Sequence, residues 1–243
     1  MEPLKVKTGA ISAGAVSADA GGADIAVALS AYGLIPRGGF NFAEGEDAPA
    51  GPSGQPARAV LLVGQASAAP WPHFLEWRKA QPDDLQNPLD TWARTAIAGV
   101  AEQFGARAVS PSDRPYLPFQ QWAMRAEGLK PSPLGILMHP RYGLWHAYRG
   151  ALLFNAALDF PVFEEPMHLC DACIGKPCMN ACPVDAYSQA GFVYEACLGH
   201  VRSAAGEVCM SHGCLDRNAC PYGAAYRYPA NVQAFHMRAF ASR

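Results

Sequence analysis

The sequence has few charges and none of the long apolar runs that mark membrane proteins. Only 16% of its 243 residues are charged and the net charge is −2, so the chain as a whole lacks the basic surface of nucleic-acid-binding proteins. No run approaches the roughly 18 apolar residues of a membrane-spanning helix, and we expect no membrane partner. A P-loop, a G-x-G-x-x-G fingerprint and the pattern of a Ser/His/Asp triad are also absent.

Half of the residues are hydrophobic, which is enough for a buried core and excludes a wholly disordered chain. The length suggests one or two domains. The Ala/Gly/Ser-rich stretch after Lys7 has only Ile11 and Val16 as large aliphatic residues, too few for the apolar part of a secretory leader. We therefore expect a cytoplasmic protein whose cysteines stay reduced.

Local patterns predict an α+β fold for the first part of the chain. Asn87 as N-cap, Pro88 and apolar residues at helical spacing predict a helix over 87–105. The run Ala-Val-Leu-Leu-Val at 59–63 predicts a buried strand that ends before Gly64. The remaining expectations are helices over 21–33 and 231–240, a loop over 45–58, a strand over 106–109, irregular structure over 110–119, and two strands within 134–154 around a turn at 139–143.

All eight cysteines lie between Cys170 and Cys220, and their spacing divides them into two groups. The first group reads C-x2-C-x4-C-x3-C-P, and the second comprises Cys197 followed by C-x4-C-x5-C-P from Cys209. Bacterial ferredoxins with two [4Fe–4S] clusters use C-x2-C-x2-C-x3-C-P, in which the fourth cysteine ligates the other cluster. By that crossed logic we expect two [4Fe–4S] clusters, one held by Cys170, Cys173, Cys178 and Cys220 and one by Cys182, Cys197, Cys209 and Cys214.

Two other readings use the same cysteines. Two four-cysteine zinc sites would need the same number of thiolates, but such sites use paired C-x2-4-C knuckles. The spacing from Cys214 to Cys220 is too wide for a knuckle, and the two Cys-Pro endings are not a zinc feature. Disulfides fit poorly in a reducing compartment.

The segment from Gly135 to Gly150, GILMHPRYGLWHAYRG, resembles the G-x-x-x-H-P-R-[FY]-G-x-W-x-x-x-R-G stretch of the CblC-type cobalamin-processing chaperones. Upstream, P-x-x-R-P-x4-Q with Arg114 and Gln120 matches the same family, and Asn87-Pro88-Leu89-Asp90 is similar to its D-P-V-D helix start. The resemblance covers about residues 58–163. It implies a nitroreductase-like α+β fold that binds cobalamin base-off and removes its upper axial group reductively.

The resemblance also implies roles for single residues. Arg149 would face the pocket and bind a thiol, phosphate or carboxylate group, since arginine donates two parallel hydrogen bonds, although a surface ion pair would explain it as well. Gly135 and Gly143 would let a flat macrocycle approach, or are plain turn glycines. Independently of the resemblance, a lone histidine is more often a structural residue than a ligand, so we expect neither His139 nor His146 to coordinate cobalt. Tyr116 lies in a proline-rich loop and is a candidate proton donor. The expected cobalamin-binding residues are Arg114, Gln120, Gly135, His139, Arg141, Gly143, Trp145, Tyr148 and Arg149.

The order of the two parts is similar to that in epoxyqueuosine reductases and reductive dehalogenases, which join a corrin-binding domain to a two-cluster ferredoxin module. We expect a CblC-like cobalamin-binding domain over 1–163 and a ferredoxin-like domain with a C-terminal helix over 164–243. The resulting hypothesis is a cobalamin-dependent iron–sulfur oxidoreductase that receives electrons from a donor protein. The alternatives are a ferredoxin with a protein-docking domain, and an enzyme acting on tRNA, against which the slight negative charge argues.

Overall fold

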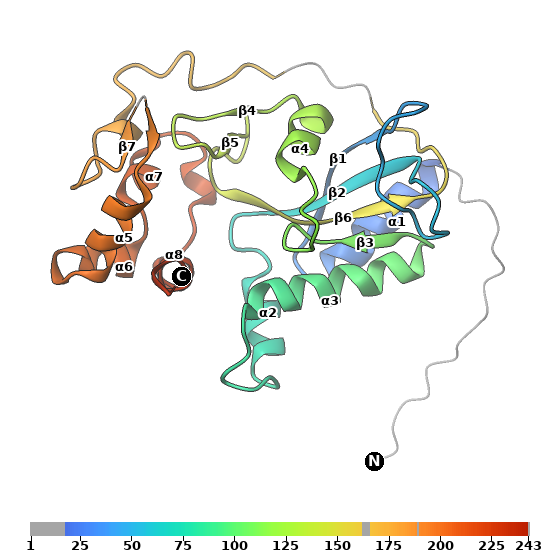
Figure 1. The fold of residues 1–243 in the computed structure, drawn as a ribbon, viewed down its shortest axis with the longest axis horizontal. Coiled ribbons are helices and arrows are strands. Elements are labelled where there is room, and N and C mark those ends of the chain that lie inside the picture. The colour runs from blue at the N-terminus through green and yellow to red at the C-terminus, as the bar shows by residue number, and fades with distance from the viewer. Residues whose placement is uncertain (1–17, 162–165, 189, 243) are drawn as a thin grey trace.

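A four-stranded antiparallel sheet in the order β1-β2-β6-β3 forms the centre of the first part of the chain (Figure 1). The computed structural model describes residues 18–161, 166–188 and 190–242. The sheet consists of β1 (Ile35–Asn41), β2 (Ala59–Ala66), β3 (Arg107–Val109) and β6 (His146–Phe154), and a separate pair consists of β4 (Lys130–Pro131) and β5 (Leu137–Met138). The helices of this part are α1 (Ala18–Ser30), α2 (Trp71–Arg78), α3 (Pro88–Gln103) and α4 (Phe119–Glu127).

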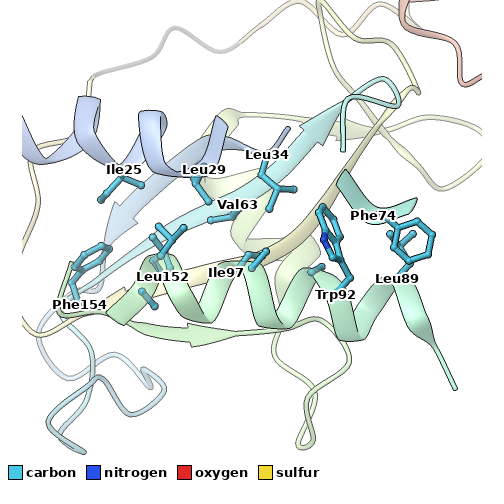
Figure 2. Close-up of a cluster of buried hydrophobic side chains, with 14 of the residues drawn as sticks. Ile25, Leu29, Leu34, Val63, Phe74, Leu89, Trp92, Ile97, Leu152 and Phe154 are labelled. Carbon is cyan, nitrogen blue, oxygen red and sulfur yellow. The ribbon is translucent and has the colours of Figure 1, made fainter. Parts of the chain in front are cut away.

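Both faces of the sheet are covered by helices, which explains the unbroken apolar run in β2. Val63 and Leu152 lie in one buried cluster with residues of α1 and α3, whereas Val60 and Leu153 lie in a second cluster with residues of α4. Because successive residues of a strand point to opposite faces, a strand covered on both sides must be apolar at every position. Figure 2 shows side chains of α1 and α3 packed on the sheet in the first cluster.

Two neighbouring β-bulges redirect two arginines. In the pairing of β1 with β2, Arg37 and Gly38 together oppose Leu62, and in the pairing of β2 with β6, Arg149 is the extra residue between Tyr148 and Gly150. A Cβ at Gly64, which pairs with Tyr148, would collide with the carbonyl oxygen of Ala147, so this bulge requires glycine. Bulges commonly re-aim side chains next to functional sites.

The part of the chain that contains the cysteines has shorter elements. Its strands β7 (Tyr187–Ser188) and β8 (Gly191–Phe192) pair with each other. Its helices are α5 (Tyr194–Arg202), α6 (Glu207–His212), α7 (Leu215–Ala219) and α8 (Ala230–Ala241), with 3-10 turns at Pro177–Met179, Ala204–Gly206 and Ala224–Tyr226. The last helix returns to the first part, where Phe235 contacts the rings of Trp71 and Phe74 at 5.1 and 5.5 Å between centroids.

The expected helices and strands of the first part and the tail helix are confirmed, with three corrections. Asn87 does not cap α3 with its side chain, because its backbone is left-handed at φ 48°. The strand at 59–63 continues through Gly64, where the bulge lies. Strands β5 and β6 belong to different sheets, and only an isolated bridge between His139 and Gly143 joins the two sides of that turn.

Short elements with weak patterns escaped the sequence analysis, namely β1, α2, α4 and the helices between the cysteines. The expected domain boundary between residues 163 and 164 falls in 162–165, outside the described residues. No helix in the described part of the chain is long and apolar enough to cross a membrane.

Candidate functional site

The first set of cysteines lines one small pocket between the two parts of the chain. Its members are Cys170, Cys173, Cys178 and Cys220, and the wall on the other side is formed by Ser132, Pro133, Met138 and Leu144. Cys220 reaches the other three because α7, which it follows, packs against the 3-10 turn that contains Cys178. The Lys176 ammonium donates to the carbonyl oxygen of Cys170 and so ties down the loop of the C-x4-C spacing. Three of the four cysteines are buried, Cys173 being the exception.

The thiols of this set are close enough to influence one another. Burial raises the pKa of Cys170 to about 11, and repulsion from the thiolates of Cys220, Cys178 and Cys173 adds to the rise. Burial also raises the pKa of Cys178 and of Cys220, again with repulsion from members of the same set. Without a cation the thiols of Cys170, Cys178 and Cys220 would therefore be protonated at neutral pH, so the pocket favours a positively charged group that replaces the protons.

The second set consists of Cys182, Cys197, Cys209 and Cys214. Burial raises the pKa of Cys197 to about 11, with further repulsion from the other three members. Wherever repulsion from one cysteine raises the pKa of another, the two cysteines belong to the same set. The backbone N–H of Ala186 donates to the Cys182 sulfur at 3.4 Å.

Asp216, which the sequence analysis did not single out, lies between the two sets. It is only 1% exposed, its Oδ1 accepts the N–H of Ala181 at 3.0 Å, and its Oδ2 has no partner. Its charge raises the pKa of Cys178 in the first set and of Cys197, Cys209 and Cys214 in the second. No pattern in the sequence distinguishes it from other aspartates, because its position depends on the packing of α7.

Neither set forms a site for a single metal ion. Within residues 18–161, 166–188 and 190–242, no three His, Cys, Asp or Glu side chains converge closely enough to hold one ion. All eight cysteines belong to these residues, and all are free thiols rather than disulfides.

A larger cavity adjoins the pocket of the first set. This junction cavity, of about 770 Å³, lies between the turn Ser132–Gly135 on one side and Met179, Tyr187 and Phe192 on the other, and it shares Ser132, Pro133 and Lys176 with the cysteine pocket. Gly135 lies in its wall, with φ 73° and open space where a Cβ would stand. Gln120 donates to the Gly135 carbonyl oxygen at 3.2 Å. Two of the expected cobalamin-binding residues therefore meet here.

A second large cavity follows the edge of the sheet at β1. This edge cavity, also about 770 Å³, includes His139 and Pro140 in its wall. The residue before them, Met138, lines the cysteine pocket instead, because neighbouring residues of an extended chain point to opposite sides. The segment 138–140 thus separates the first set of cysteines from the edge cavity.

A buried ion pair lies in the wall of the edge cavity. The Arg37 guanidinium donates to both carboxylate oxygens of Glu127, at 2.7 and 2.5 Å, and to the Tyr148 hydroxyl at 3.1 Å. Glu127 also accepts from the Gly38 N–H at 2.8 Å and from the Tyr148 hydroxyl at 2.6 Å. The bulge in β1 aims Arg37 inward, and Glu127 is the last residue of α4. Neither residue was among the site residues predicted from the sequence, although the two glycines after Arg37 mark the bulge.

Two histidines of the 135–150 segment lie beside this ion pair and are held neutral. Burial and the charge of Arg37 lower the pKa of His146 to about 3, and the same two causes lower the pKa of His139 to about 4. Arginine only donates, so Nδ1 of His146 accepts from Arg37 at 3.2 Å, and Nε2 donates to the Leu137 carbonyl at 2.9 Å. Both nitrogens of His146 are therefore engaged.

Three residues of the 135–150 segment hold the two parts of the chain together. Arg141 donates to the Tyr226 hydroxyl at 2.7 Å. A Cβ at Gly143 would collide with the carbonyl oxygen of Tyr222, so the glycine admits the backbone of the cysteine-containing part. Trp145, fully buried, contacts Tyr228 at 5.4 Å between ring centroids, and the Arg217 guanidinium lies over its ring at 4.4 Å.

Arg149 also faces this junction. Its Nε donates to Gln65 at 2.6 Å, and burial lowers its pKa, with the charge of Arg217 acting in the same direction. The arginine is thus half-buried beside residues of the tail rather than in a surface ion pair.

The remaining predicted residues lie apart from these features. Arg114 and Tyr116 are exposed in a loop, with the guanidinium 4.8 Å from the tyrosine ring. Neither lines the junction cavity, the edge cavity or the cysteine pocket of the described chain. Tyr148, in contrast, is half-buried and belongs to the Arg37–Glu127 cluster, where it donates to Glu127 and accepts from Arg37.

Comparison with known proteins identifies the fold. No protein-family model matches the chain, and no curated protein matches its sequence. The structure of the Caenorhabditis elegans B12-trafficking protein CblC matches with a TM-score of 0.52 and 16% identity, over 92% of this chain and 94% of that chain. A match of this extent reaches beyond residue 163 into the cysteine-containing part, and it shows that the two chains share a fold.

Epoxyqueuosine reductases match more weakly. The enzyme of Bacillus subtilis has a TM-score of 0.44 and 13% identity, over 72% of this chain and 51% of that chain. The enzyme of Streptococcus thermophilus has a TM-score of 0.45 and 15% identity, over 71% of this chain and 51% of that chain. The chain spans about half the length of these reductases.

Proposed function

We propose that the protein is an iron–sulfur corrinoid reductase in which two [4Fe–4S] clusters pass electrons to a corrinoid in the junction cavity. The observation that carries the proposal is the shared wall: four cysteines line a pocket that borders a cavity large enough for an organic cofactor. When bound, the clusters would supply electrons one at a time and the corrinoid would accept them at its metal.

The donor set of each group fits a four-iron cluster. Four thiolates are the ligands that such a cluster needs, and each of them binds a different iron atom, so they stand farther apart than around a single ion. Cys170, Cys173, Cys178 and Cys220 would hold the first cluster, and Cys182, Cys197, Cys209 and Cys214 the second. The backbone N–H that reaches the Cys182 sulfur would stabilise a thiolate there.

The junction cavity fits a flat ligand beside the first cluster. Gly135 leaves its wall open on one side, and Tyr187 and Phe192, whose rings stack at 4.6 Å, form the other side. The amide of Gln120 lies next to Gly135 and would bind a polar edge of the ligand. Arg149, Arg141 and Trp145 would act by holding the cysteine-containing part in place, which keeps the cluster and the cavity together.

An anaerobic titration of cluster-loaded protein with cob(II)alamin, followed by electron paramagnetic resonance, tests the proposal. We expect the spectrum to change to the base-off form. The variant Gly135→Val should weaken this change at least about tenfold, because a side chain would occupy the cavity wall. Gly45→Val is the matched control, since Gly45 has a similar φ of 77° and also has open space around it but lies in an exposed loop.

A spectrum of free cob(II)alamin beside intact clusters would overturn the proposal. The chain would then be a ferredoxin with a docking domain, and retention on tRNA at moderate salt would separate that outcome from an enzyme that acts on tRNA. Equal loss in both glycine variants would show that backbone strain, rather than the cavity, controls binding.

A further inference from the structure

The edge cavity is not used by the proposed function, and it is built as a binding site. Its lining comes from both faces of the sheet: Ile25 of α1 and Phe104 after α3 on one face, Ala126 of α4 and His139 on the other. The segment 155–161 covers it and is fastened to β1 by two hydrogen bonds between the Asn41 side chain and the backbone of Leu158, at 2.8 and 2.9 Å. The cavity therefore borders both faces of the sheet at its edge.

The two ends of the edge cavity differ in polarity. At one end the lining is apolar, with Ile25, Leu61, Phe104 and Phe154. At the other end stand Arg37, Glu127 and His139, and the covering segment adds the exposed polar residues Asn155 and Asp159 to the lining. A ligand that fills the cavity must therefore carry its polar group at one end of an apolar body.

The ion pair at the polar end carries no net charge. Arg37 and Glu127 neutralise each other at 2.5 Å, with side chains only 3% and 14% exposed. The carboxylate of Glu127 already accepts two hydrogen bonds from Arg37 and one each from Gly38 and Tyr148, which fills its acceptor capacity. The ion pair therefore presents no net charge to an ionic group of a ligand, so a neutral group fits this end best.

His139 presents one hydrogen-bond donor at this end. Its Nδ1 accepts the backbone N–H groups of Arg141 and Tyr142 at 3.0 and 3.1 Å, so in the neutral ring the proton is on Nε2. The ring is stacked on Tyr142 at 4.1 Å, which fixes its orientation. In the described chain Nε2 has no hydrogen-bond partner, so it remains available to an acceptor on a ligand.

We propose that the edge cavity binds a neutral, elongated apolar molecule that ends in a carbonyl oxygen. The oxygen accepts the Nε2–H of His139, and the apolar chain follows β1 toward Ile25 and Phe104. The site is separate from the junction cavity and does not depend on the proposed reaction with a corrinoid. The segment 138–140 separates the ligand in the edge cavity from the cysteines, because Met138 faces the cysteine pocket and His139 faces the edge cavity.

Isothermal titration of the full, cluster-loaded chain with 2-octanone, 2-nonanone and 2-decanone tests this site. Each added methylene should tighten binding about fourfold, as expected for buried apolar surface. His139→Phe should weaken the binding of 2-decanone about fivefold, the effect of one hydrogen bond. His139→Gln, which retains an N–H donor, should recover part of the loss.

A second pair of variants separates filling of the cavity from damage to the fold. Leu158→Trp, in the covering segment, should abolish the gain in affinity for each methylene added to the ketone, because the indole occupies the space of the ketone's apolar chain. Leu75→Trp adds the same ring at an exposed position of α2 and should leave the binding unchanged. Prior loading with cobalamin should leave the affinity for 2-decanone unchanged.

Three results would overturn the proposal. They are an affinity that does not depend on chain length, equal affinities of the wild type and His139→Phe, and displacement of 2-decanone by cobalamin. The last result would show that the edge cavity belongs to the corrinoid site. Failure of the proposed function would give a different result. The cobalamin spectrum would then remain that of the free form, and cobalamin would not change the affinity for 2-decanone.

Discussion

Residues 35–154 bury leucine, valine and aromatic side chains against both faces of a sheet, whereas residues 170–220 bury cysteine as their main apolar side chain. The longest helix between the cysteines has 9 residues, too few to be stable alone in water. Val208 and Ile174 of this part are exposed at 55% and 96%. We therefore expect the first part to fold on its own apolar core. Under the proposed function, the second part would also depend on its clusters and on the surface of the first part, on which it lies.

The largest effect expected from this difference follows from removing the iron. Under the proposed function, metal binding supplies free energy of folding, so chelation should expose the backbone of α5 to α7 while β2 and β6 stay protected. Amide hydrogen exchange followed by mass spectrometry measures both regions in one sample. Equal loss of protection in both would show that the two parts form a single cooperative unit.

A pair of double variants tests how the cysteines divide between the clusters. Cys178→Ser with Cys220→Ser should remove one cluster and leave about four iron atoms per chain, because the structure places both in the first set. Cys178→Ser with Cys182→Ser should remove both clusters, although these cysteines are neighbours in sequence. Iron analysis of the purified variants gives the answer, and the opposite pattern would mean that each sequence group forms its own cluster.

Breaking the buried ion pair should destabilise the first part strongly. Glu127→Gln leaves the charge of Arg37 buried without its counter-charge, and we expect a loss of about 3–5 kcal/mol in the free energy of unfolding. Glu46→Gln breaks the pair with Arg125, whose side chains are 31% and 43% exposed, and should cost only about 0–1 kcal/mol. Denaturant unfolding of both variants makes the comparison, and equal losses would contradict the role of burial.

Truncation of a buried apolar side chain in the first part should lower the stability of the protein, whereas truncation of an exposed one in the second part should not. Leu152→Ala removes a fully buried side chain and should cost about 2–5 kcal/mol. Val208→Ala changes an exposed side chain of α6 and should stay within about 0.5 kcal/mol. Thermal unfolding measures both, and a large effect of Val208→Ala would indicate that another surface covers α6.

Acid should weaken the first part through its neutral histidines. The pKa values of His139 and His146 are lowered to about 4 and about 3 by burial and by Arg37, so the unfolded chain binds protons before the folded chain does. The stability that these residues contribute is present above pH 6.5 and falls as the pH drops toward the folded values, with a slope of up to about 1.4 kcal/mol per pH unit for each histidine.

Unfolding of His146→Gln at pH 7 and pH 5 tests this dependence. The variant should show a smaller difference between the two pH values than the wild type, because one titrating group is gone. His73→Gln, at an exposed position of α2, is the control and should keep the full difference. An unchanged difference in His146→Gln would assign the acid sensitivity to other groups.

Much of this protein follows from the sequence alone. The helix over 88–103, the strands β2, β3 and β6 and the tail helix follow from periodicity and from turn residues, whereas the edge strand β1 does not. The two groups of four cysteines follow from spacing, and the resemblance of the 135–150 segment leads to a fold that the match with CblC shows.

Only the tertiary structure decides the rest. Arg37 and Glu127 are 90 residues apart, and their pairing requires a bulge in β1 next to the end of α4. The segment of Arg141, Gly143 and Trp145 contacts the cysteine-containing part because residues 222–228 lie on it. Local sequence sets the preferences of each element, but which side chains meet across the molecule depends on long-range packing, and no pattern within one segment records it.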